Sequence, residues 1–218
     1  MKLKQLDKQF KGYVTPVKDQ GSCGSCWAHA ATGTLEGALF RKTGKLMSLS
    51  EQNLVDCDQK NKGCEGGLEV KAFDYVMEHG INLEDDYPYE GQQKSCRFNS
   101  SKKLEPKHDY ISIREKDEID LTNFLATFGP IPVGIDAGPR SFQHYKSGVY
   151  YDRTCKKIRL NHSVLLVGYG SDENGDYYIM KNSWGTQWGD NGYMNMARNK
   201  QNACGIASDA TVLFLKSI

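Results

Sequence analysis

Apolar positions in the first half of the chain follow the spacing of helices. Three helices are predicted, over residues 26–42, 50–57 and 68–78. The first stretch is rich in Ala, Leu and Glu and is closed by Gly44, while the second begins at Ser50, a favourable N-cap residue. The third places Phe73 and Val76 on one face and is followed by Gly80. The pattern therefore predicts a mainly helical first half.

The second half of the chain changes to short apolar runs typical of strands. Strands are predicted over residues 133–135, 164–169, 177–180 and 193–197, with turns rich in Gly and Asn between them. One helical patch interrupts this region, because Leu121, Phe124, Leu125 and Phe128 recur on one face. The change of character falls near residues 112–117. We therefore predict an α+β fold, in which a groove between the two halves is the usual place for a substrate.

Composition and charge narrow the class of protein. Hydrophobic residues make up 39% and charged residues 25% of the 218 residues, which is typical of a globular protein. A formal net charge of +1 argues against nucleic acid or an anionic membrane as partner. No apolar run approaches the roughly 18–20 residues that span a bilayer. Residues 1–5 also lack the apolar region of a signal peptide.

The number of cysteines is informative about chemistry and compartment. The seven are Cys23, Cys26, Cys57, Cys64, Cys96, Cys155 and Cys204. An odd number suggests three disulfides and one thiol kept free for chemistry, and disulfides indicate an oxidising or secretory setting. Asn99 begins a glycosylation sequon in a polar stretch, which agrees with that setting, whereas the sequon at Asn161 adjoins an apolar strand and should carry no glycan. The alternative is a cytosolic protein with seven reduced cysteines.

Four separated residues form a candidate site for nucleophilic catalysis. A thiol attacks a carbonyl only as thiolate, and the helix predicted to begin at Cys26 favours that anion through its unpaired N–H groups and its dipole. His162 as imidazolium stabilises the thiolate further and donates a proton to the leaving amine. Asn182 is expected to orient the His162 ring, while the Gln20 amide and the Cys26 backbone N–H supply donors for an oxyanion.

The sequence around these residues resembles the papain family of cysteine peptidases, and its cathepsin L-type branch most closely. Residues 20–27 read QGSCGSCW, which contains the signature of the papain and cathepsin nucleophile, with His and Asn expected roughly 130–150 residues downstream. His162 and Asn182 follow near that separation, in the contexts NHS and KNSWG. The resemblance covers nearly the whole chain, and it implies that Trp184 shields the His–Asn hydrogen bond from water.

The resemblance implies a fold and a biological setting. The fold is papain-like, with a helical left domain over residues 13–112, a β-barrel-like right domain over residues 113–218 together with 1–12, and the active-site cleft between them. The implied activity is that of a lysosomal or secreted cysteine endopeptidase, made as a zymogen. Its partners would be protein and peptide substrates, its own propeptide and cystatin-type inhibitors, and the enzyme would be a monomer without cofactor or metal.

The resemblance also selects one disulfide pattern, which the sequence alone leaves open among 15 connectivities. The implied bridges are Cys23–Cys64, Cys57–Cys96 and Cys155–Cys204. Each would contribute about 2–4 kcal/mol to stability. Cys26 is then the free thiol.

Specificity is expected to depend on the pocket for P2, the second residue before the cleaved bond. By resemblance this pocket is lined by Leu68, Glu69, Gly134, Asn161, Ser163 and Asp209. Gly66 and Gly67 present backbone to the main chain of the substrate. Carboxylates at positions 69 and 209, where relatives mostly have apolar residues, predict that Arg or Lys is tolerated at P2. The alternative is that both carboxylates turn to solvent and the pocket remains a hydrophobic selector.

Cleavage is expected inside chains, because exopeptidase relatives block the groove with added loops or a retained prosegment fragment. The stretch over residues 96–110 is short and polar and has no room for such an insertion. His29 lies where the family usually has Phe, and we expect it to be a packing residue and not a modulator of catalysis.

Two other interpretations of the motifs remain open. Cys23 and Cys26 have the spacing of a redox pair or of half a zinc site, although Cys57 and Cys64 are more widely spaced than zinc ligands usually are. An inactive relative that keeps the fold for binding should have lost one of the four catalytic residues, and all four are present.

The chain departs from the family at two places. Residues 7–9 read Asp-Lys-Gln where the family has Asp-Trp-Arg, so the anchoring of the N-terminal segment is expected to differ. Residues 212–215 read Val-Leu-Phe-Leu in place of a Tyr-Pro element near the C-terminus. Neither change touches the catalytic residues.

Overall fold

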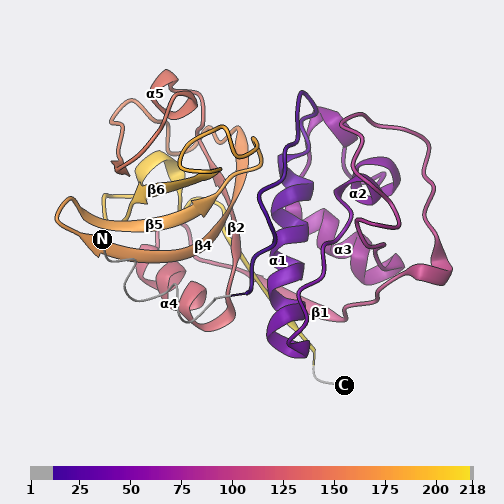
Figure 1. Ribbon diagram of the computed structural model, residues 1–218. Helices are drawn as coiled ribbons and strands as arrows, with labels where there is room; N and C mark the ends of the chain where they lie inside the picture. The colour runs from indigo at the N-terminus through magenta and orange to yellow at the C-terminus, as the bar shows by residue number, and fades with distance from the viewer. Residues whose placement is uncertain (1–11, 217–218) are drawn as a thin grey trace.

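The computed structural model describes residues 12–216, which form a helical part and a sheet part side by side (Figure 1). Residues 7–9, and the assignment of residues 1–11 to the β-rich domain, lie outside the described residues. Mixed helix and sheet content confirms the predicted α+β class. The helical part contains α1 (Cys26–Thr43), α2 (Glu51–Cys57) and α3 (Glu69–His79), with short 3-10 turns at η1 (Gly63–Glu65) and η2 (Ser100–Lys102).

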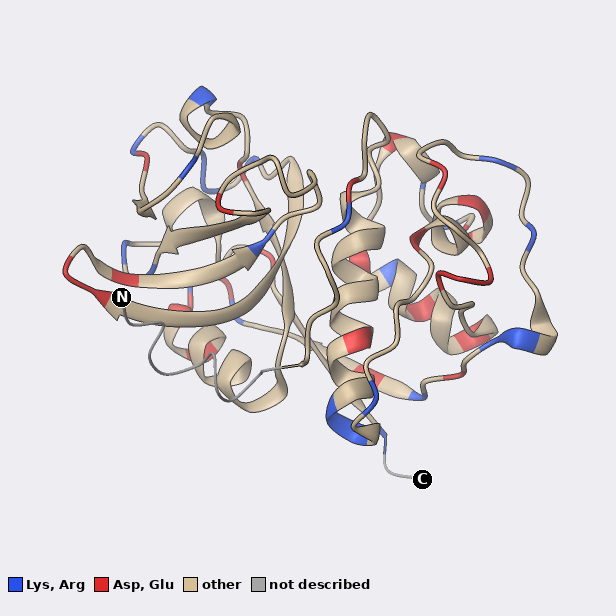
Figure 2. Ribbon diagram, viewed as in Figure 1, with Lys and Arg blue, Asp and Glu red and all other residues tan. Residues whose placement is uncertain are grey.

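The three helices predicted in the first half are confirmed, and their ends follow from local chemistry. The Ser50 side chain accepts a hydrogen bond from the Asn53 N–H and so caps α2. Gly44 ends α1 in the left-handed region, at a φ of 70°, where glycine has no side chain to clash. The last turn of α1 carries Arg41 and Lys42, visible as a blue segment in Figure 2, which suits the negative end of the helix dipole.

The sheet part is built on five strands in the order β2-β4-β5-β6-β3. These strands are β2 (Ile131–Ile135), β3 (Val149–Tyr150), β4 (His162–Asp172), β5 (Gly175–Lys181) and β6 (Tyr193–Ala197). All neighbours are antiparallel except β3 and β6, which run parallel. The four strands predicted from the sequence are confirmed. Over the residues that the structure describes, this is an open sheet and not a closed barrel.

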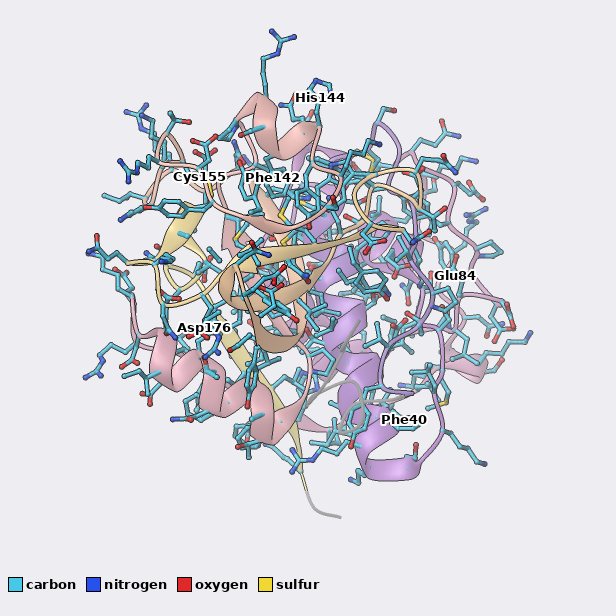
Figure 3. All side chains as sticks on the ribbon, turned by 60° about the vertical axis from the view of Figure 1, so that its left-hand side comes forward. Phe40, Glu84, Phe142, His144, Cys155 and Asp176 are labelled. Atoms are coloured by element: carbon cyan, nitrogen blue, oxygen red, sulfur yellow. A yellow bond between two sulfur atoms is a disulfide. The ribbon has the colours of Figure 1, made fainter. Side chains whose placement is uncertain are left out.

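Helices and a second, smaller sheet complete the sheet part. Helix α4 (Glu118–Phe128) is the predicted helical patch, and α5 (Arg140–Gln143) is a single turn that the sequence pattern did not reveal. Figure 3 shows Phe142 of α5 turned into the interior and His144 outside it, in line with the complete burial of Phe142. Strands β1 (His108–Ser112) and β7 (Thr211–Leu215) pair antiparallel, and neither was predicted.

Strand β7 connects the two hydrophobic cores. Val212 lies in the core of the sheet part, while the next residue, Leu213, lies in the core of the helical part. Successive side chains of a strand point to opposite faces, so one short strand serves both cores. This gives a structural role to the Val-Leu-Phe-Leu run over residues 212–215.

Three disulfides join described cysteines: Cys23–Cys64, Cys57–Cys96 and Cys155–Cys204. These are the pairs that the resemblance implies. The first two lie in the helical part and the third in the sheet part. Cys26 is the free cysteine and is partly exposed.

Candidate active site

The free thiol lies at the N-terminus of the long helix α1. Ser25, the residue before it, makes no side-chain capping hydrogen bond to the helix. The backbone N–H groups of Cys26, Trp27 and Ser163 therefore remain available to stabilise a thiolate, and each lowers the pKa of Cys26. Burial is the larger effect and raises the pKa of Cys26 on balance, with the carboxyl group of Glu69 adding to the rise.

His162 is the first residue of β4, beside the thiol, because its neighbour Ser163 is the residue whose N–H faces Cys26. Its Nε2 donates to Oδ1 of Asn182 over 2.8 Å. Nε2 therefore carries a proton, and Nδ1 is the nitrogen left for chemistry. Burial of the ring lowers the pKa of His162 to about 4, against the opposing effect of the Asn182 hydrogen bond.

Asn182 follows directly on β5 and is held from several sides. Its Oδ1 also accepts the backbone N–H of Ser183, at 2.8 Å, and its own N–H donates to the carbonyl of Gly192. A backbone N–H can only donate, so these contacts fix which end of the amide is oxygen. The Asn182 side chain therefore presents its oxygen, Oδ1, to the His162 ring.

An aromatic layer lies against the His162 ring. The Trp184 ring centroid is 4.7 Å from that of His162, with 32° between the planes. Phe142 and Trp188 pack edge-on against Trp184 at 5.6 and 5.4 Å. These contacts hold the Trp184 ring against the His162 ring.

Gln20 is held on the other side of the site. Its Nε2 donates to the carbonyl of Cys23 over 2.8 Å, and its Oε1 accepts the hydroxyl of Ser183 over 2.7 Å. The amide has two N–H donors, so one remains for a ligand. Ser183 thus links Gln20 to Asn182, a supporting role that sequence analysis missed although Ser183 lies inside the KNSWG motif.

Tyr89 is a second supporting residue that the sequence did not reveal. Its hydroxyl donates to the carbonyl of Gln20 over 2.9 Å and lies 2.6 Å from the hydroxyl of Ser25. It therefore supports the nucleophile loop through the backbone of Gln20 and the side chain of Ser25. No local motif marks Tyr89, because its partners lie more than 60 positions away in the chain.

The glycines and Leu68 expected to bind the substrate backbone lie at the start of α3. Gly66 has a φ of 110°, which other residues rarely adopt. A Cβ on Gly67 would lie 2.7 Å from Trp27, so only glycine fits there. Asn61 holds the backbone of Leu68, because its side chain accepts a hydrogen bond from the Leu68 N–H and donates one to the Leu68 carbonyl. The Leu68 side chain itself is 46% exposed.

The remaining pocket candidates differ in burial. Glu69 is buried and accepts a short hydrogen bond from the hydroxyl of Ser163, which joins α3 to β4 beside the thiol. Gly134 pairs with Ser163 in the sheet and donates its N–H to the carbonyl of Asp209. The Asp209 side chain is exposed, and that of Asn161 is exposed with its Oδ1 bonded to the Ala137 N–H.

The two carboxyl groups have different electrostatic surroundings. Burial raises the pKa of Glu69 to about 7, against the opposing effect of the Ser163 hydroxyl. Partial burial and the nearby Glu115 also raise the pKa of Asp209. At neutral pH Glu69 is therefore divided between its charged and neutral forms.

The interpretation of Cys23 and Cys26 as a zinc or redox pair is wrong, because Cys23 is bonded to Cys64. Over residues 12–216, no group of three or more His, Cys, Asp or Glu side chains is placed to hold a metal ion. In the same part of the chain, no helix has the length and apolar character needed to cross a membrane.

Comparison with known proteins identifies the family. The family model described as papain family cysteine protease matches residues 3–214. The chain is 53% identical to a cathepsin L-like peptidase of Aedes aegypti over 210 residues and 54% identical to a cathepsin L-like protein of Caenorhabditis elegans over 211 residues. These matches cover 94% and 95% of this chain, but only 62% and 63% of the relatives. The chain thus spans less than two thirds of the length of these curated relatives.

Solved structures give the same result. The fold superposes on digestive procathepsin L 3 from the larval midgut of Tenebrio molitor with a TM-score of 0.91 and 46% sequence identity. That match covers 94% of this chain and 68% of the other. Digestive procathepsin L2 of the same insect also gives a TM-score of 0.91, at 42% identity and with 96% and 67% of the two chains covered. The chain is therefore a member of the papain family of cysteine proteases, and it is similar to the cathepsin L-like peptidases within that family.

Proposed function

We propose that this chain is a cysteine endopeptidase that cleaves internal peptide bonds through an acyl-enzyme at Cys26, with His162 as acid and base. One observation carries the proposal. The free thiol begins a helix and faces the N–H of Ser163, while the adjacent His162 has its ring fixed by Asn182.

The first step is attack of the Cys26 sulfur on the carbonyl carbon of the substrate. Burial opposes a lone charge on either group, raising the pKa of Cys26 and lowering that of His162. Transfer of the proton from thiol to ring creates two opposite charges together, and their attraction in a low-dielectric site offsets much of this penalty. The helix N-terminus stabilises the thiolate further.

The tetrahedral intermediate needs donors for its oxyanion. The free N–H of the Gln20 side chain and the backbone N–H of Cys26 are proposed for this role. The imidazolium of His162 then protonates the leaving nitrogen as the C–N bond breaks, which leaves a thioester on Cys26. Water attacks the thioester with His162 as base, and the carboxylic acid and the thiol are released.

We propose that the two catalytic groups belong to different domains. The segment over residues 13–112 contributes Cys26, and the segment over residues 113–218 contributes His162 and Asn182. The hydrogen bond from Ser163 to Glu69 links the two across the site, which supports a substrate cleft at this junction. Strand β1 lies in the first segment and pairs with β7 of the second, so the division is one of catalytic contribution and not of independent packing.

Specificity at P2 is proposed to depend on Glu69 and Asp209. Glu69 is bonded to Ser163 at the base of the pocket, and Asp209 stands at its exposed side, next to Gly134. A basic P2 side chain would pair with Asp209 and compete with Ser163 for the Glu69 carboxylate. Acceptance of Arg at P2 should therefore increase as Glu69 loses its proton, near the pH of about 7 where that group titrates. The competing possibility is a hydrophobic selector, with Glu69 kept neutral by its burial.

The biological setting follows from the family and is proposed on the same basis. Protein and peptide substrates, a propeptide of its own and cystatin-type inhibitors fit a member of this family that is made as a zymogen. Three disulfides support a lysosomal or secreted location. Asn99 is exposed at the start of η2 and is the proposed glycosylation site, and we propose that the enzyme is a monomer.

Titration of the thiol by an epoxysuccinyl inhibitor tests the proposal directly. One equivalent should abolish peptidase activity and label Cys26 alone, as read by peptide mapping. Digestion of a denatured protein should yield internal fragments and not a ladder of terminal dipeptides. Full activity after complete labelling of Cys26 would refute the mechanism, and a dipeptide ladder would refute the endopeptidase assignment.

A further inference from the structure

The residues behind the catalytic hydrogen bond contain a second polar site. Helix α1 runs along the junction of the two parts and packs against β4 (Figure 1). A small cavity there has about 20 Å³ of room for the centre of a water molecule. Its lining includes His29 of α1, Lys181 of β5 and Asn182. One water molecule needs roughly 10–15 Å³ of such space, so the cavity can hold one.

His29, a lining residue of this cavity, has an acceptor that is unpaired among the described residues. Its Nδ1 lies 3.0 Å from the carbonyl of Ser25, which can only accept, so Nδ1 carries the ring proton. Nε2 of the neutral ring is then an acceptor. It is buried and has no hydrogen-bond partner among the described protein groups.

Asn182 contributes a donor. Its Oδ1 accepts from His162 and from the backbone N–H of Ser183, which assigns the other end of the amide as Nδ2. Nδ2 is likewise buried and has no partner within the described part of the chain. A buried polar group left without a partner is destabilising by about 1–3 kcal/mol, so two such atoms on residues that line the same cavity need an explanation.

The surroundings of His29 favour its neutral form on balance, because burial outweighs the opposing charge of Glu51. Burial lowers the pKa of His29, and the ammonium groups of Lys18 and Lys181 lower it further, while Glu51 and the Ser25 carbonyl act in the opposite direction. The ring of Tyr89 packs edge-on against it at 5.0 Å and adds no charge. The neutral ring keeps Nε2 as an acceptor.

We propose that one buried water bridges His29 and Asn182, accepting a hydrogen bond from Asn182 Nδ2 and donating one to His29 Nε2, and that His29 is thereby a positioning residue for the catalytic ring. The proposal rests on the proposed function, since it assigns His162 as the group being oriented. With both ends of the amide held, Asn182 cannot turn about its side-chain bond, and the His162 ring keeps its direction. His29 was expected to be a packing residue, and this role is added to its packing.

His29→Phe is the informative variant. It keeps a ring against Tyr89 and removes Nε2, and the Ser25 carbonyl retains the N–H groups of residues 28 and 29 as donors. We expect kcat to fall roughly 3–10-fold with little change in KM, since a water-mediated bond contributes about as much as a direct one. His29→Gln keeps one donor and one acceptor at similar reach and should return kcat to within about twofold of the wild type.

A double-mutant cycle separates positioning from packing. If His29 acts through Asn182, His29→Phe should change kcat less than about twofold in an Asn182→Ala background. An equal loss in both backgrounds, or a Gln variant no better than Phe, would overturn the proposal. Inhibitor titration of Cys26 gives the concentration of active sites, so that a loss of folded enzyme is not read as a loss of kcat.

A crystal structure of the wild-type chain provides the direct measurement. We expect one ordered water within hydrogen-bond distance of both His29 Nε2 and Asn182 Nδ2, and its loss in His29→Phe. A cavity without that water in the wild type would overturn the proposal even if the chain is an active peptidase. Activity that survives Cys26→Ala would instead refute the proposed function, so the two failures are distinguishable.

Discussion

The helical part and the sheet part stabilise buried charge in different ways. Behind the nucleophile, Lys18 donates to both carboxylate oxygens of Glu51, at 2.7 and 2.8 Å, and lies 3.6 Å from Glu36. In the sheet part, buried Glu118 accepts the backbone N–H groups of Asn199 and Asn202 at 2.6 and 2.8 Å. The first arrangement pairs opposite charges, whereas the second satisfies a carboxylate with neutral donors.

The two parts also differ in the direction in which they shift the pKa of several acidic groups. Burial raises the pKa of both Glu69 and Glu84 to about 7, and both lie in the helical part, where Figure 3 labels Glu84. In the sheet part, the partly exposed Asp152 and Asp176 have a lowered pKa because hydroxyl groups of Ser141 and Ser171 donate to them. Near neutral pH, these acidic groups of the helical part should therefore respond to pH more strongly than Asp152 and Asp176 of the sheet part.

The largest expected effects come from the two reacting groups of the proposed mechanism, Cys26 in the helical part and His162 in the sheet part. Cys26→Ala, Cys26→Ser or His162→Ala should lower kcat/KM by roughly 10⁴-fold or more, while Asn182→Ala, which only removes the orienting group, should be milder at about 10²-fold. The measurement is hydrolysis of a fluorogenic peptide, with circular dichroism and thiol counting as controls for the fold and three disulfides. Turnover near the wild-type level in a Cys26 variant would contradict the mechanism.

Stability measurements sharpen the comparison of buried charges. Glu51→Gln removes a charge facing Lys18 and should lower the free energy of unfolding by about 3 kcal/mol, because an ammonium group loses its main partner in a buried site. Glu118→Gln keeps an acceptor for the two backbone N–H groups and should lower it by about 1 kcal/mol.

Urea unfolding of both variants in the Cys26→Ala background, which prevents self-digestion, gives the two values. Lys18 retains Glu36 and Glu84 at 3.6 and 3.7 Å, so the Glu51→Gln variant should still fold. Equal losses in the two variants would show that paired and unpaired carboxylates are equivalent here.

Two groups should dominate the pH dependence of stability, with opposite signs. His162 of the sheet part, whose pKa is lowered to about 4, makes stability rise with pH up to about 6.5, and Glu69 of the helical part makes it fall. Glu69 has a folded pKa of about 7, above that of glutamate in an unfolded chain, so the folded state holds a proton that the unfolded state has released. The contribution of Glu69 to the free energy of unfolding is fully present below about pH 4.5. It is lost as the pH rises through about 7, at up to roughly 1.4 kcal/mol per pH unit. The total is about 3 kcal/mol.

Glu69→Gln removes this titration. Between pH 4.5 and pH 7.5, Glu69→Gln should lose less of its free energy of unfolding than the parent does. Asp176→Asn in the sheet part should show the same change over this pH range as the parent. Both are measured against pH in the Cys26→Ala background. A slope that Glu69→Gln does not flatten would show that Glu69 titrates at its ordinary value.

The smallest expected effect concerns P2 specificity, where the two parts meet. Asp209→Ala should reduce kcat/KM for Arg at P2, relative to Leu at P2, by roughly tenfold, as expected for loss of one charge-assisted hydrogen bond. Matched peptides with Arg, Leu or Phe at P2 give the ratio. The Arg/Leu ratio of the wild type should also rise between pH 5.5 and 7.5 as Glu69 ionises. A ratio that neither Asp209→Ala nor pH changes would favour the hydrophobic selector.

The sequence by itself determined the helices, the main strands and the family. The helices of the first half are visible because their buried face recurs every 3.6 residues, and Ser50 and Gly44 mark their ends through local backbone chemistry. The nucleophile loop and the contexts of His162 and Asn182 are likewise contiguous stretches. Information of this kind lies within a few residues of the position that it describes.

Only the tertiary structure decided which distant groups meet. The cysteine count by itself left 15 connectivities open, and the structure joins the three pairs that the family resemblance implies. Strands β1 and β7 are five residues each and form a two-stranded sheet with one another, so periodicity alone did not reveal them. The contact of Glu69 with Ser163 and the support of Gln20 by Tyr89 join residues far apart in the chain. Such pairs depend on long-range packing, which brings together side chains whose local sequence carries no sign of the partner.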